Sequence, residues 1–163
     1  MHQTELIYST SLIRKAIFSF WYKTVGPLMI LTWLALMGYF IFLMANEDYS
    51  WITGALGAIL FFSVAIAITL YLVHYRNSIN KFKKMGHPDA LFLASEDNFT
   101  FSSGRGSVTL PWSSIESVWQ FSDYYLLFYS KSQFSIFPLA GVNEEIQHYM
   151  IRHIQDAGGK IIN

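Results

Sequence analysis

The sequence contains no cysteine and few charged residues, and each of these features excludes some classes of protein. The absence of cysteine excludes a disulfide framework. Charged residues make up 13% of the chain, against about 25% in a typical soluble domain, whereas apolar residues make up 53%. Charge is wholly absent from residues 25–45 and 51–73. The low charge content is therefore concentrated in two apolar runs.

These two runs predict a transmembrane hairpin over residues 25–73. At about 1.5 Å of rise per residue, a helix over either run is long enough to cross a hydrocarbon core of about 30 Å. Two core helices of a soluble protein are disfavoured, because the rest of so short a chain could hardly cover them. A cleavable signal peptide is also disfavoured, because the first run begins late, is too long, and is followed by no small-residue cleavage site before the second.

Lysine and arginine flank the hairpin on the side of both chain ends. The connection between the runs, residues 46–50, carries only Glu47 and Asp48 as charged residues. By the positive-inside rule, we expect both termini to face the cytoplasm. The predicted basic flank consists of Arg14, Lys15, Lys23, Arg76, Lys81, Lys83 and Lys84.

Small residues within the runs predict where helices pack closely, since small side chains let two backbones approach in lipid. Packing of the two helices on each other is the favoured interpretation, and a homodimer contact is the alternative. No ionisable residue lies inside either run, which argues against an ion or proton pathway. The predicted helix-packing residues are Gly38, Gly54, Gly57 and Ala58.

The segments on either side of the hairpin have patterns of their own. Residues 1–24 predict a strand near residues 4–9, followed by an interfacial amphipathic helix that interleaves cations with apolar residues. Gly26 separates this helix from the first span, and Pro27 fits the first turn of that span. Residues 74–89 predict a basic juxtamembrane connector.

Residues 90–163 predict a small antiparallel β domain. Short alternating runs are separated by polar turns, most clearly at residues 102–107 (SSGRGS). A C-terminal helix over residues 143–157 follows, with Asn143 as its N-cap and Gly158 at its end. The predicted fold class is membrane α + β, a two-helix transmembrane hairpin with a small antiparallel β domain capped by a C-terminal α-helix.

Short motifs in this C-terminal part resemble a known family. They are residues 112–115 (WSSI) after a polar hairpin, residues 123–130 (DYYLLFYS), a strand ending at Phe137 and Pro138, and the final amphipathic helix. The sequence is similar here to the C-terminal domain of YcxB-like bacterial membrane proteins. The resemblance implies a two-helix hairpin in the bacterial inner membrane and a cytosolic domain of pleckstrin-homology-like (PH-like) shape. It also allows the N-terminal segment to add a strand to the β domain, and it brings no catalytic residues.

No motif in the sequence predicts an enzyme. There is no G-x-S-x-G elbow, and Gly104 and Gly106 lack the lysine and hydroxyl of a phosphate-binding loop, so a hairpin turn explains them. Glu144 and His148 are four residues apart on the predicted helix, but a solvated helix face explains them better than a metal site. We therefore expect no catalytic residues, no metal and no cofactor.

Residues 85–163 contain more acidic than basic side chains, and this net negative charge limits which partners they can bind. Four cations stand against eight carboxylates, which gives a net charge of −4. Because phosphoinositide and nucleic-acid binding require a basic cluster, neither is expected. A protein partner suits this domain better. The four cations are Arg105, Lys131, Arg152 and Lys160.

Aromatic residues are abundant in the same region, and most are expected to fill the interior of the sheet. The expected core residues are Phe99, Phe101, Trp112, Trp119, Leu126, Phe128, Phe134 and Ile136. Tyrosine is common at binding hot spots, and the alternate face of the tyrosine-rich strand is expected to be exposed. The predicted partner-binding residues are Asp123, Tyr124, Tyr125, Tyr129 and Phe137.

Two functions remain open at this point. The first is a non-enzymatic membrane protein whose cytosolic domain binds a protein partner, for example an immunity protein that neutralises a bacterial toxin acting at the membrane or in the cytosol. The second is a membrane-associated sensor or scaffold that binds a lipid or small molecule within its β domain.

Overall fold

The computed structural model describes residues 2–84, 89–104, 106–131 and 133–162. The chain divides into two compact units. Ile17–Asn77 form a helical hairpin, whereas Met1–Ala16 and Ser78–Asn163 together form a β domain. Along the chain, the hairpin is therefore inserted into the β domain, which draws residues from both termini.

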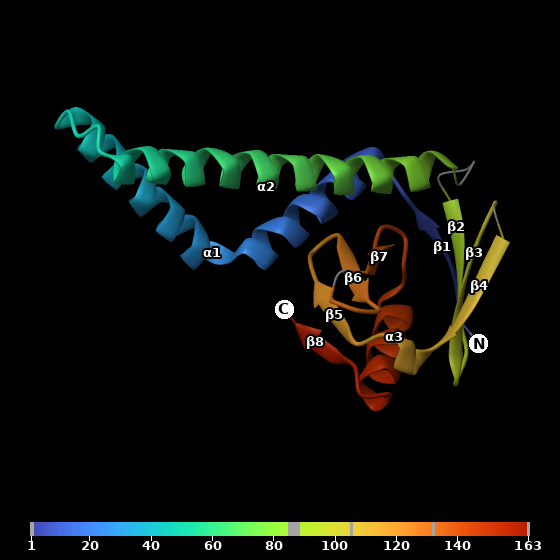
Figure 1. Cartoon of the computed structure of the whole chain (residues 1–163). Coiled ribbons are helices and arrows are strands. Elements are labelled where there is room, and N and C mark those ends of the chain that lie inside the picture. The colour runs from blue at the N-terminus through green and yellow to red at the C-terminus, as the bar shows by residue number, and fades with distance from the viewer. Residues whose placement is uncertain (1, 85–88, 105, 132, 163) are drawn as a thin grey trace. The chain divides into compact units, whose positions relative to one another are not determined.

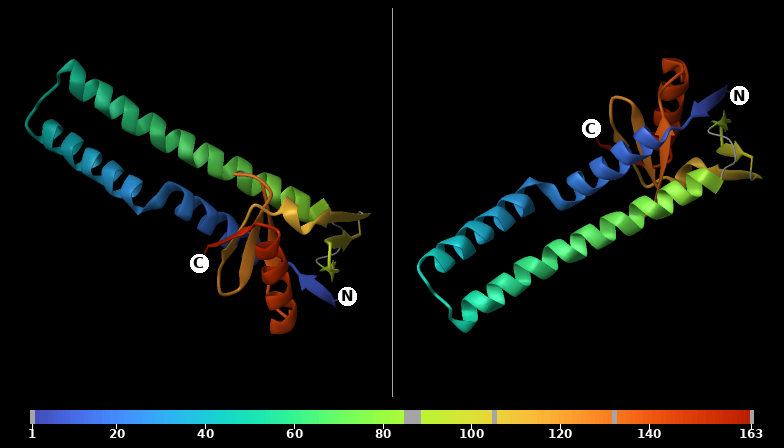
Figure 2. Two further views of the ribbon diagram at one scale, coloured as in Figure 1. Left: turned by 90° about the horizontal axis from the view of Figure 1, so that it is seen from below. Right: turned by 90° about the horizontal axis from the view of Figure 1, so that it is seen from above.

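Two long helices build the hairpin. α1 runs over Thr10–Ala45 and α2 over Trp51–Lys84, and in Figures 1 and 2 they lie side by side, joined by a short turn. Both are long and apolar enough to cross a membrane. Of the most apolar 18-residue window in each, 0% and 6% is buried. These side chains are therefore outside any protein core, as a lipid environment requires.

α1 is interrupted at Gly26, as the sequence predicts. The backbone there has φ 74° and ψ 156°, and Pro27 follows as the first residue of the second helical segment. Glycine reaches this positive φ without the steric cost that other residues meet. The bend is visible in the blue part of the ribbon in Figure 2.

The contact between α1 and α2 involves one close glycine and one hydrogen bond. A Cβ added at Gly57 would lie 2.9 Å from Cε2 of Phe40, so the Phe40 ring occupies the space left by the missing side chain. Trp33 Nε1 donates a hydrogen bond of 3.1 Å to Ser63 Oγ, which joins the two helices through polar atoms. Small and polar residues thus mark the contact, as expected between helices in lipid.

The other predicted helix-packing residues do not lie at this contact. A Cβ at Gly38 or Gly54 would meet no atom within 4 Å, and Ala58 is exposed. The prediction that these three lie at the contact of α1 with α2 was wrong, because the spacing of small residues does not fix how each helix is rotated about its axis. The alternative, a homodimer contact, stays a prediction.

The β domain contains two four-stranded sheets, with strand orders β1-β2-β3-β4 and β7-β6-β5-β8. In the first, β1 pairs antiparallel with β2 from His2↔Ala94 to Ile7↔Asp89, so the N-terminal segment adds an edge strand. The strands are β1 (His2–Ile7), β2 (Asp89–Ala94), β3 (Asn98–Ser103), β4 (Gly106–Pro111), β5 (Ser117–Gln120), β6 (Tyr124–Phe128), β7 (Phe134–Pro138) and β8 (Lys160–Ile162).

The predicted C-terminal helix is α3, over Glu144–Asp156. Asn143 caps it, since its side chain accepts a hydrogen bond of 3.1 Å from the Glu145 backbone N–H. After α3 the chain forms β8, which pairs in parallel with β5 and which the sequence pattern did not indicate. The predicted fold class is otherwise confirmed, with two apolar helices, a small β domain and a C-terminal helix.

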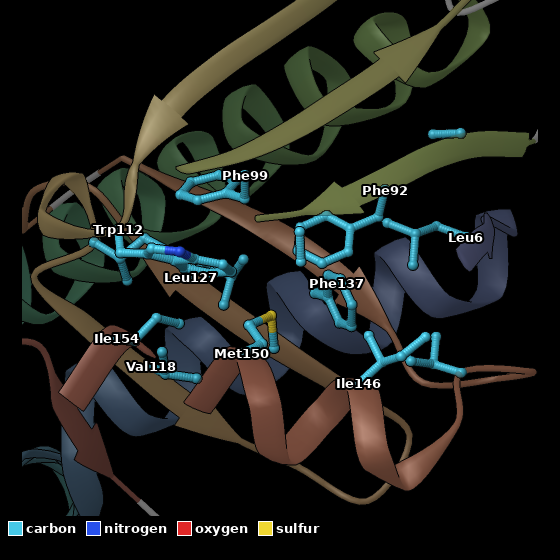
Figure 3. Packing of buried hydrophobic residues seen from close by; sticks show 14 residues of the cluster. Leu6, Phe92, Phe99, Trp112, Val118, Leu127, Phe137, Ile146, Met150 and Ile154 are labelled. Carbon is cyan, nitrogen blue, oxygen red and sulfur yellow. The ribbon is translucent and has the colours of Figure 1, made fainter. Parts of the chain in front are cut away.

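The core of the domain lies between the two sheets and α3 (Figure 3). Phe92 from the first sheet meets Phe137 from the second edge to face, with ring centroids 4.9 Å apart. The apolar stripe of α3, formed by Ile146, Met150 and Ile154, is buried. Among the expected core residues, Phe99, Trp112, Leu126 and Phe128 are buried, and Phe101, Trp119, Phe134 and Ile136 are half-buried.

Trp112 opens a short 3-10 helix, η1 (Trp112–Ser114), between β4 and β5. Its ring lies 5.0 Å from that of Phe99, and its Nε1 donates a hydrogen bond of 3.0 Å to the Ser95 carbonyl. A buried tryptophan with its N–H satisfied is a structural residue. Trp112 therefore fixes the passage from the first sheet to the second.

Candidate partner-binding surfaces

The tyrosine-rich strand β6 is an inner strand of its sheet, between β5 and β7. Tyr124 and Phe137 are both 0% exposed. The prediction that they offer exposed contact for a partner was wrong. Both faces of this sheet are covered, so alternation along β6 does not separate a buried face from a solvated one.

The two faces of β6 are covered in different ways. Tyr125 pairs across strands with Phe137 and packs with it against the main core. Tyr124 points to the other face, where its hydroxyl donates a hydrogen bond of 3.3 Å to the Lys15 carbonyl in α1. Its ring also stacks on Phe121 at 4.9 Å. Tyr124 thus holds the first turns of α1 to the second sheet.

Tyr125 and Tyr129 are half-buried and hydrogen-bonded within the domain. The Tyr125 hydroxyl donates a hydrogen bond of 3.1 Å to Gln147 Oε1 on α3. Burial raises the pKa of both tyrosines, and for Tyr129 a hydrogen bond with Ser135 partly opposes the rise. These rings contribute to internal packing, since both pack against the core cluster.

Asp123 is exposed and forms an ion pair with Lys15 of α1. The hydrogen bond from Lys15 lowers the pKa of the Asp123 carboxyl, with a smaller contribution from Ser122, and the same bond raises the pKa of Lys15. A residue predicted for partner binding and one predicted for the membrane flank are therefore joined to each other. With the Tyr124 hydrogen bond, the pair fastens the start of α1 to the turn before β6.

The other predicted flank cations lie along α1 and α2. Arg14, Arg76, Lys83 and Lys84 are exposed, and Lys23 is half-buried. The side chain of Lys81, like Arg105 in the β3–β4 turn, lies outside the described residues.

The first segment of α1 was expected to be an interfacial amphipathic helix. Within it, Ile13, Ala16, Ile17 and Phe20 form a buried stripe at helical spacing, whereas Phe18 and Tyr22 are exposed. The segment is therefore amphipathic, and its place at the membrane surface stays a prediction.

Strand β4 presents a surface that the sequence reading missed. It pairs with β3 on one side and is the edge of its sheet, and the side chains from Gly106 to Thr109 are all exposed. Val108 is 58% exposed. No residue of the strand is charged, although natural edge strands usually carry charges that prevent pairing with another chain. The absence of charge between residues 106 and 111 was the available signal.

A pocket of about 780 Å³ opens beside this edge. Its walls come from the β3–β4 hairpin, η1, the β6–β7 connection, Tyr8 after β1 and Ala90 at the start of β2. No sequence motif indicated it, because segments far apart in the chain form its walls. Within the described ranges, no group of three or more His, Asp or Glu residues could hold a metal ion, and Glu144 and His148 line a separate shallow pocket beside α3.

The comparison with known proteins gives one positive finding. No curated protein and no solved structure matches the chain. Residues 94–154, from the end of β2 almost to the end of α3, match the model of the YcxB-like protein family, the family that the sequence motifs indicated.

Proposed function

We propose that this chain is a membrane-anchored binding protein whose β domain takes a protein partner by adding a strand from that partner to β4. An extended segment can pair with an exposed sheet edge through main-chain hydrogen bonds, while side-chain positions on alternate faces supply specificity. The observation that carries the proposal is the uncharged, exposed edge of β4, with Val108 58% exposed.

The anchor is the hairpin, which we assign to the bacterial inner membrane with both termini in the cytoplasm. Support comes from the unburied apolar windows of α1 and α2, the exposed cations near their domain ends, and the acidic turn at Glu47 and Asp48. Positive charge near the ends of spans favours the cytoplasmic side.

The domain has the features of a binding module more than of an enzyme. Its titratable groups with shifted pKa values are engaged in fixing the fold: Tyr8 and Tyr125 donate to internal acceptors, and Lys15 pairs with Asp123. Two packed sheets with a helix at the core also accord with the PH-like shape that the family resemblance implies. Such scaffolds present edges and loops for recognition, and the site rather than the fold decides the function.

Within this class, we propose an immunity role, in which the partner is a toxin that acts at the inner membrane or in the cytosol. A short hairpin without ionisable residues in its spans can anchor the protein in the membrane but lacks the residues of an ion pathway. Recognition of the toxin is then the role of the β domain. The unpaired edge of β4 would bind an extended segment of the toxin and keep it from its target.

The edge can be tested with matched charge substitutions. Val108→Lys places a charge on the edge strand β4, which disfavours pairing with another chain, whereas Ile7→Lys places one on β1, at the opposite edge of the same sheet, where Ile7 is 53% exposed. Partners are captured by crosslinking in native membranes and identified by mass spectrometry, and the identified protein is then purified. We expect Val108→Lys to weaken its binding about tenfold or more and Ile7→Lys to leave it unchanged.

A third variant separates edge pairing from simple hydrophobic contact. Val108→Thr keeps β propensity and removes apolar area without adding charge, so binding through backbone hydrogen bonds should persist. Equal binding by the wild-type chain and Val108→Lys would refute the proposal that the partner pairs with the edge of β4. The immunity role is tested by coexpressing the purified partner's gene: growth that is the same with and without this chain would refute that role.

A further inference from the structure

We propose that the pocket beside β4 binds an uncharged lipid with a hydroxyl-bearing headgroup, of the monoacylglycerol or diacylglycerol class. The pocket volume of about 780 Å³ is within the range of small-molecule sites. This site adjoins the proposed strand addition, because Val108 of β4 belongs to both, and it is therefore tested through Ser103 of β3.

The inner wall of the pocket is apolar and already part of the folded core. Phe101, Leu110, Tyr8 and Tyr129 line it, and all four are partly buried against the core cluster. The Tyr8 hydroxyl donates a hydrogen bond of 2.9 Å to the Ile136 carbonyl, which fixes this ring between the two sheets. A wall held in this way is preformed for an acyl chain, so little ordering is needed on binding.

The rim of the pocket carries hydroxyl groups. Five serines line it, at positions 102, 103, 113, 114 and 135. Each serine hydroxyl can both donate and accept, which suits the hydroxyl groups of a glycerol headgroup. A lining that combines apolar rings with hydroxyl groups matches a molecule with one apolar end and one uncharged polar end.

Charge at the pocket disfavours an anionic lipid. Among the described residues that line it, Glu116 is the one acidic residue, and none is lysine or arginine. Burial raises the pKa values of Tyr8 and Tyr129, which keeps both phenols neutral. A phosphate group would meet a carboxylate without a compensating cation on these walls.

The position of the pocket along the chain points to the bilayer as the source. Tyr8 lies two residues before α1 begins, and Ala90 lies six residues after α2 ends. Six residues span at most about 20 Å, which limits the distance between Ala90 and the end of α2. A chain with two candidate membrane spans would meet amphiphiles in the bilayer.

The test uses the full-length chain in nanodiscs with a photoactivatable monoacylglycerol, and crosslinks are mapped by mass spectrometry. Labelling of residues 101–116 reports the pocket, and labelling of the hairpin provides an internal reference for lipid contact. We expect Ser103→Trp, which fills the pocket, to lower the pocket signal about tenfold relative to the hairpin signal. Ser107→Trp is the matched control, because Ser107 belongs to the same strand hairpin and does not line the pocket.

Competition on the unsubstituted chain identifies the ligand class even if a tryptophan variant does not fold. Unlabelled monoacylglycerol should remove the pocket signal, whereas phosphatidylglycerol should need about a tenfold higher concentration and glycerol should have no effect. A pocket signal that survives unlabelled monoacylglycerol or persists in folded Ser103→Trp overturns the site. Equal competition by phosphatidylglycerol overturns the uncharged class, and equal competition by glycerol overturns the lipid assignment.

Discussion

The hairpin exposes most of its large apolar side chains, whereas the β domain buries them. In the hairpin, Trp51 is 81% exposed and Phe61 is 70% exposed, while the buried residues include Thr53. In the domain, Phe92 and Phe137 are 0% exposed. The same residue types therefore take opposite positions: burial removes an aromatic ring from water in the domain, whereas an exposed ring on a long apolar helix suits a lipid environment.

The largest expected effect comes from deleting one aromatic ring in each unit. Phe92→Ala removes a ring that contacts Phe137, Phe99 and Phe101 in the core and should destabilise the domain by about 3–5 kcal/mol. Phe61→Ala removes a ring exposed on the hairpin and should change the stability of the domain by about 0.5 kcal/mol or less. Thermal unfolding of the full-length chain in detergent, followed by near-ultraviolet circular dichroism, measures both. Equal losses would contradict this difference between the two units.

Sequence reasoning predicted the helices, the break in α1 and the helix cap better than it predicted which side of each element is buried. Two uncharged runs, the Gly26–Pro27 break and the Asn143 cap are local signals, and each is confirmed. The orientation of β6, by contrast, is not determined by a local sequence signal. Residues 124–129 are apolar or aromatic throughout, and such a run indicates a strand buried on both faces without showing which face meets the main core.

The candidate surfaces depended even more on tertiary structure. The edge status of β4 follows from the strand order, although its lack of charge could have raised the question. The pocket walls come from residues as far apart as Tyr8 and Ser135, so no motif could indicate them. β8 was missed because a three-residue strand after a helix has too short a pattern to recognise.

A smaller effect distinguishes the glycine at the helix contact from those outside it. In Gly57→Ala, the new Cβ would approach Phe40 to 2.9 Å, so the ring must move or the helices separate, at a cost of about 1–3 kcal/mol. In Gly54→Ala, nothing lies within 4 Å, and alanine should stabilise the helix by about 0.5–1 kcal/mol. Denaturation of the hairpin by sodium dodecyl sulfate in mixed micelles compares the two variants. A larger loss for Gly54→Ala would place a second close helix contact at Gly54.

The smallest effect concerns the ion pair of Lys15 and Asp123, both of which belong to the β domain. The pKa of Asp123 is lowered in the folded chain, so its contribution to stability is present above the ordinary carboxyl pKa of 3.8 and is lost as pH falls through the lowered value. The pKa of Lys15 is raised, so its contribution is present below 10.5 and is lost as pH rises through the raised value. The pair therefore contributes fully between these limits.

Both partners are exposed, so the stabilisation is small and should decrease as salt increases. Asp123→Asn should remove the loss of stability in acid that this carboxylate causes, and it should free the start of α1 to exchange amide hydrogen faster around Lys15. Asp156→Asn is the control, because that carboxylate lies 3.9 Å from Arg152 within α3 and joins no second segment. Faster exchange confined to α1 in Asp123→Asn would show that the first turns of α1 belong to the β domain. Unchanged exchange there would mean that the ion pair does not stabilise the first turns of α1.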